Sequence, residues 1–104
     1  MIKKIITTVL DPEVKDKLYK YSQENYIPAG KIVANSINEF NNSIKTNRDY
    51  KLKFNDFDRI KTETFNCSIT EDLFKIVVEL STNLGISKRL LLREIITDFV
   101  TQKL

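Results

Sequence analysis

The sequence predicts a mainly helical fold with one small antiparallel β-ribbon. A pattern of strand, helix, turn and helix occurs twice, and an offset of 59 residues lays the second copy on the first without a gap. This register predicts two units, 1–41 and 61–104, joined by a linker at 42–60. Its seven apolar matches are Leu10 with Ile69, Val14 with Leu73, Leu18 with Val77, Ile27 with Ile86, Ile32 with Leu91, Ile37 with Ile96 and Phe40 with Phe99.

The first unit begins with the β-branched run IITTVL at 5–10, which is typical of a strand. Asp11 is expected to cap the following helix at 12–24, because Pro12 is favoured at a first helical position. A second helix is expected to start near Pro28 and to end at about Asn41. Between these helices, Tyr26 is expected to pack in the turn.

The register of the first strand stays open, because its alternation is weak. In one register Ile5, Thr7 and Val9 face outward, and in the other a slip of one residue turns Lys4, Ile6 and Thr8 outward. The match of Leu10 with Ile69 favours the first register.

The second unit has a clearer pattern. Its strand, 61–69, alternates, so that Thr64, Asn66 and Ser68 face one way and Phe65, Cys67 and Ile69 the other. The following elements have ordinary start and stop signals: Thr70 caps a helix at 71–84, Gly85 ends it, and Ser87 caps a helix at 88–102.

The linker at 42–60 has no clear period and contains five basic and three acidic residues. It is expected to be a connector with a short extended piece at 50–54, or alternatively to add a basic contact to DNA.

Composition argues against catalysis and against a resident cofactor. The 104 residues include one cysteine and no histidine, which leaves no internal disulfide and few of the usual metal ligands or general bases. No phosphate-binding loop or nucleophile motif is present. No metal, small-molecule ligand or membrane partner is therefore expected. The expected location is the cytoplasm. The net charge of +3 permits binding to nucleic acid.

The segments TFNCSI before TEDL, and LGISKRLLLREIITDF after them, resemble the ribbon-helix-helix family of DNA-binding proteins, which includes the Arc and MetJ repressors. The resemblance is close over 61–103 and looser over 3–41. The chain is similar to the single-chain tandem form found among plasmid and viral regulators. That form implies two ribbon-helix-helix repeats that make an intramolecular pseudo-dimer.

The resemblance implies a sequence-specific transcriptional regulator, such as a repressor, that inserts its ribbon into the major groove of double-stranded DNA. Outward Ile and Val can meet only thymine methyl groups or other apolar surface, so the second unit is expected to provide most of the specificity. The residues implied to read bases are Thr64, Asn66, Ser68, Ile5, Thr7 and Val9.

The resemblance also implies that the second helix of each unit binds a phosphate at its N-terminus. Lys3 and Lys4 are expected to form a short basic arm that adds further phosphate contacts. The helix residues implied are Ser87, Lys88 and Arg89 in the second unit, and Ala29, Gly30 and Lys31 in the first.

Two alternatives stay open. The same fold serves plasmid partition and conjugation accessory proteins, and an antitoxin-like interaction module that has lost DNA binding would suit the apolar outer face of the first strand. Composition is compatible with a viral or plasmid protein, which would place it in the host cytoplasm if viral. Higher-order assembly of pseudo-dimers along DNA stays open as well.

Overall fold

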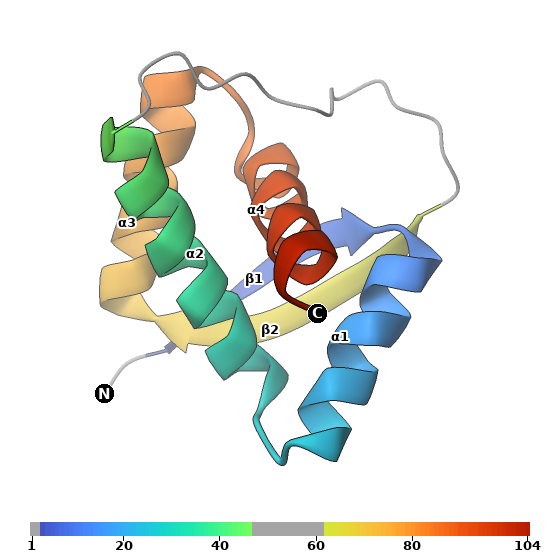
Figure 1. Ribbon diagram of the computed structural model, residues 1–104. Coiled ribbons are helices and arrows are strands. Elements are labelled where there is room, and N and C mark those ends of the chain that lie inside the picture. Colours follow the sequence, from blue (N-terminus) through green and yellow to red (C-terminus); the bar gives the residue numbers. More distant parts are fainter. Residues whose placement is uncertain (1–2, 47–61) are drawn as a thin grey trace.

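The computed structural model describes residues 3–46 and 62–104, and Figure 1 shows how their elements are arranged. Helices dominate, and two strands pair antiparallel, so the predicted mainly helical fold with a small antiparallel sheet is confirmed. The elements are β1 (Lys3–Leu10), α1 (Pro12–Glu24), α2 (Ala29–Thr46), β2 (Glu63–Thr70), α3 (Glu71–Leu84) and α4 (Lys88–Lys103).

The two strands form a ribbon although they are far apart in the sequence. Their register runs from Lys3 opposite Thr70 to Leu10 opposite Glu63. One face of the ribbon is buried against the helices and the other is exposed, as expected for alternating side chains. The inner face consists of Ile6, Thr8, Leu10, Phe65 and Ile69, all buried, and of the half-buried Cys67.

Helix α4 lies at the centre of the fold. It contacts β1 and all three other helices, and Figure 1 shows it crossing in front of the ribbon. Every residue from Leu90 to Ile96 is therefore buried, although the sequence indicated one apolar stripe. Arg93 and Glu94 belong to this buried run, and their position was not predicted.

Arg93 changes the role of Asp11. The Arg93 guanidinium, with a side chain only 5% exposed, donates to Asp11 Oδ1 at 3.2 Å. Asp11 is the N-cap residue of α1, as predicted, but its side chain makes no capping hydrogen bond to the helix. A buried cation is costly without an anionic neighbour, and this explains why the carboxylate lies against α4.

The predicted helix starts and the predicted helix end in the second unit are confirmed. The Thr70 hydroxyl accepts from the Leu73 N–H at 3.3 Å, and the Ser87 hydroxyl accepts from the Leu90 N–H at 3.1 Å. Gly85 ends α3 in the left-handed region, with φ of 68°.

The two interhelical turns share details at the same offset of 59. The Ser22 hydroxyl donates to the Ile27 carbonyl, and the Ser81 hydroxyl donates to the Ile86 carbonyl. Tyr26 has a φ of 54° where the second turn has Gly85. Tyr26 is also 94% exposed, so the prediction that it packs in the turn is wrong.

Helix α2 is longer than predicted. It continues to Thr46, so the first residues of the expected linker are helical. Asn41, Asn42 and Ser43 are weak helix formers, but Ile44 follows Phe40 by one turn and packs against the core, which favours continuation. The predicted extended piece at 50–54 lies outside the described residues. Within the described ranges, no helix is long and apolar enough to cross a membrane.

Candidate nucleic-acid interface

The six residues predicted to read bases lie together on the outer face of the ribbon. They form three cross-strand pairs: Ile5 with Ser68, Thr7 with Asn66, and Val9 with Thr64. Val9 is half-buried and the other five are exposed. We call this set the outer face.

The first strand has the register that the sequence favoured, with Ile5, Thr7 and Val9 facing outward. In the alternative, Ile6 and Thr8 would point outward, but both are buried. Lys4 shares their side of the strand and is nevertheless exposed, because it lies at the strand end beyond the core. The outward slip of one residue is therefore excluded.

Thr8 connects the ribbon to the start of α4. Its buried hydroxyl donates to the Arg89 carbonyl at 2.6 Å, which satisfies a polar group on the inner face. The N-terminus of α4 is thereby held beside β1, although the two segments belong to opposite ends of the sequence.

Gly30 places the start of α2 in a similar way beside β2. A Cβ atom at position 30 would lie 2.7 Å from the Ser68 carbonyl oxygen, so only glycine permits this approach without displacement. Each second helix thus begins beside the strand of the other half of the chain.

A groove of about 320 Å³ lies where α2 meets the ribbon. Lys3 and Lys31 line it, together with Gly30 and Ser68, and none of the described residues that line it is acidic. The first N–H groups of a helix have no intrahelical acceptor, and the helix dipole favours an anion there. This groove combines two cations with a helix N-terminus and suits a phosphate group.

Ser87, Lys88 and Arg89 are exposed at the start of α4. The Lys88 ammonium lies 5.9 Å from the centre of the Phe74 ring in α3, a cation–π arrangement. The predicted cluster of hydroxyl, amides and charge is therefore present at this helix N-terminus.

Lys3 and Lys4 do not form a separate arm. Both belong to β1, opposite Thr70 and Ile69, because the ribbon extends to the end of β2. Lys3 faces the groove at α2, whereas Lys4 lines another groove, beside Phe74 and Glu71 of α3. Lys3 thus lies near Lys31, and Lys4 lies near Phe74, the ring that Lys88 also contacts.

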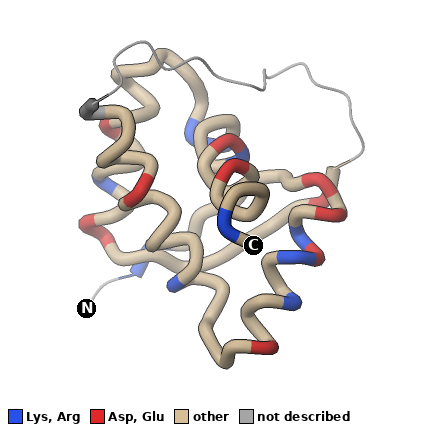
Figure 2. The backbone as a smooth tube through the Cα atoms, in the orientation of Figure 1, with Lys and Arg blue, Asp and Glu red and all other residues tan. Residues whose placement is uncertain are grey.

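Charge is confined to the ends of the ribbon. Figure 2 shows both strands largely without charged residues, which occur only as Lys3 and Lys4 at one end and Glu63 at the other. The Glu63 carboxylate accepts from the Lys15 ammonium at 3.3 Å. Lys15 reduces the negative charge at that end, a role that no sequence pattern indicated.

Cys67 lies on the inner face, as predicted. Burial raises the pKa of its thiol from an ordinary 9.0 to about 11, so it stays protonated at neutral pH. In the described part of the chain, no cluster of three or more His, Cys, Asp or Glu residues could hold a metal ion.

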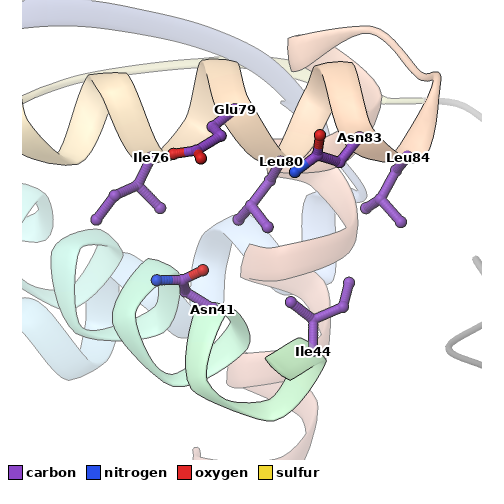
Figure 3. A pocket seen from close by; sticks show the side chains of 7 residues that line it. All are labelled: Asn41, Ile44, Ile76, Glu79, Leu80, Asn83 and Leu84. Carbon is purple, nitrogen blue, oxygen red and sulfur yellow. The ribbon is translucent and has the colours of Figure 1, made fainter. Parts of the chain in front are cut away.

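A third groove, of about 580 Å³, lies between α2 and α3 (Figure 3). It contains none of the predicted site residues. Its lining mixes aliphatic side chains with one carboxylate and two amides: Ile44, Ile76, Leu80, Leu84, Glu79, Asn41 and Asn83.

Comparisons with known proteins give no further lead. The chain matches no protein-family model, no curated protein and no solved structure.

Proposed function

We propose that this chain is a sequence-specific transcriptional regulator that binds double-stranded DNA through the ribbon. The observation that carries the proposal is the outer face itself: six side chains in three pairs, with a helix N-terminus beside each strand. A two-stranded ribbon fits the major groove, which is about 12 Å wide.

The proposal includes an intramolecular pseudo-dimer of two ribbon-helix-helix units. The matching turn contacts of Ser22 and Ser81 support it, as does the positive φ shared by Tyr26 and Gly85. Thr7 also pairs with Asn66, the residue 59 positions further along. An approximate two-fold axis would therefore pass between these two residues.

In this arrangement the outer face reads base edges. Asn66 can make a bidentate contact to adenine, while Thr and Ser hydroxyls both donate and accept. The exposed polar stripe of β2 thus provides hydrogen-bonding discrimination at the centre and ends of the ribbon.

The helix N-termini fix the ribbon on the DNA backbone. The groove at Lys3, Gly30 and Lys31 would take one phosphate, and the start of α4 with Lys88 and Arg89 would take another. Such contacts position the protein without reading sequence.

Electrophoretic mobility shifts test this function, with random and promoter-proximal duplexes at several salt concentrations. The double variant Lys88→Ala/Arg89→Ala should weaken binding to all duplexes alike and reduce the salt slope by about 0.9 per lost phosphate contact. Asn66→Ala should instead reduce the preference between duplexes. Asn35→Ala, at an exposed position further along α2, is a control that should change neither.

Wild-type protein that binds no duplex at low salt would refute the proposal. That result would favour a protein-interaction module, which one observation supports: Ile5, an apolar side chain, is 74% exposed on the outer face. A partition or conjugation accessory protein would use the same DNA contacts, so the mobility shifts leave it in the same class as a regulator.

A further inference from the structure

We infer that the outer face reads DNA in one direction, and that Ile5 selects a thymine by its 5-methyl group. The inference rests on the proposed DNA binding and adds the identity of a base and the symmetry of the site.

The two strands contribute different residues to the outer face. At the offset of 59, Ile5 corresponds to Thr64, Thr7 to Asn66 and Val9 to Ser68, so no position of the outer face has the same residue on both strands. A palindromic duplex would present identical base edges to these unlike side chains. The two halves of the preferred site must therefore differ.

Ile5 is the residue of the outer face that can recognise a methyl group. It is the most exposed apolar side chain of the ribbon, and its neighbour across the strands is the small Ser68. In the major groove, only thymine offers a methyl group; cytosine has a hydrogen on the same ring carbon beside its polar amino group, and the purines present polar N7. An aliphatic side chain over a polar edge removes water without replacing its hydrogen bonds. Ile5 consequently favours thymine over the other three bases.

The two ends of the ribbon also differ. The Ile5 end carries Lys3 and borders the groove at Gly30 and Lys31, whose described lining has no acidic residue. At the other end, Val9 is half-buried. The Glu63–Lys15 ion pair lies near Val9, whereas Lys3 and Lys31 lie near Ile5. The ends thus differ in charge as well as in shape, which gives the bound complex one orientation.

The test begins with selection of bound duplexes from a randomised library by the wild-type chain. We expect a non-palindromic consensus. Deoxyuridine, which lacks the 5-methyl group, is then placed at each thymine of the consensus in turn. At one position, affinity should fall about three- to fivefold, the value for loss of one buried methyl group.

Two variants assign that effect to Ile5. Ile5→Ala should largely remove the difference between the thymine and deoxyuridine duplexes, since alanine keeps only the Cβ atom of the isoleucine side chain. Val78→Ala truncates an exposed apolar residue of α3 and should keep the wild-type difference.

A third variant tests direction. Ile5→Thr/Thr7→Asn/Val9→Ser gives β1 the outer residues of β2, and it should select a palindromic consensus. A palindrome selected by the wild type, or equal affinity for all deoxyuridine duplexes, would overturn the inference while DNA binding itself stood. Failure of the wild type to enrich or shift any duplex would overturn the proposed function and this inference with it.

Discussion

Tyr26 and Gly85 are a natural comparison at the scale of single residues. Both have positive φ at the same place in an interhelical turn, but only one is glycine. A side chain in the left-handed region costs about 1–2 kcal/mol, because its Cβ approaches the following carbonyl oxygen. Tyr26 is almost fully exposed and gains little packing in return.

Tyr26→Gly should therefore raise the free energy of unfolding by about 0.5–1 kcal/mol, the relief of strain less the entropy cost of glycine. Gly85→Ala should have the opposite effect, of about 1 kcal/mol. Apart from the adjacent residues, no described atom lies within 4 Å of a Cβ at position 85, so that cost is conformational only. Urea unfolding followed by circular dichroism measures both, and a destabilised Tyr26→Gly would contradict the assignment of strain.

At the scale of elements, Gly30 determines how closely α2 approaches β2. Helix propensity alone predicts that Gly30→Ala stabilises α2 by about 1 kcal/mol. The close approach of Ser68 predicts the reverse, a loss of about 1–3 kcal/mol, because backbone must move to admit the new methyl group.

The sign of the stability change after Gly30→Ala thus separates the two effects in urea unfolding. Asn35→Ala, in an exposed part of the same helix, should be neutral or slightly stabilising. A stabilised Gly30→Ala would mean that α2 does not lie so close to the ribbon.

The helices and strands were largely predictable from local signals. Where an element differs from its prediction, a tertiary contact explains the difference. Thr70, Gly85 and Ser87 mark helix ends by short-range hydrogen bonds, which a sequence displays directly. The continuation of α2 depends on Ile44 meeting a core built by distant segments. The six residues of the outer face followed from alternation in β2 and from one match, Leu10 with Ile69, in β1.

Other features required the tertiary arrangement. Arg93 gave no sign of burial, because its position depends on helices that surround α4. The Asp11 carboxylate pairs with Arg93 and makes no capping hydrogen bond, although Asp11 is the N-cap residue that the sequence indicated. The Lys15–Glu63 pair likewise joins residues that only the strand pairing brings together.

At the scale of the whole molecule, the two halves share one core. β1 pairs with β2, α4 packs on β1 and α2 packs on β2, so neither half keeps its contacts without the other. The described ranges should therefore unfold in a single cooperative transition.

Ile6→Val in the first half and Ile96→Val in the second test this cooperativity, each with an expected loss of about 0.5–1.5 kcal/mol. Far-ultraviolet circular dichroism follows helices of both halves, whereas all four tyrosines lie in the first 50 residues. Both signals should shift together in each variant. Separate midpoints for circular dichroism and tyrosine fluorescence would mean that the halves unfold independently.

The pairing of Lys3 with Thr70 also has a consequence for synthesis on the ribosome. The first strand is made before its partner and before the helix that holds it at Thr8. A nascent chain therefore has half of the outer face with nothing to pair with it. The surface proposed to bind DNA therefore forms only after β2 and the start of α4 have been synthesised.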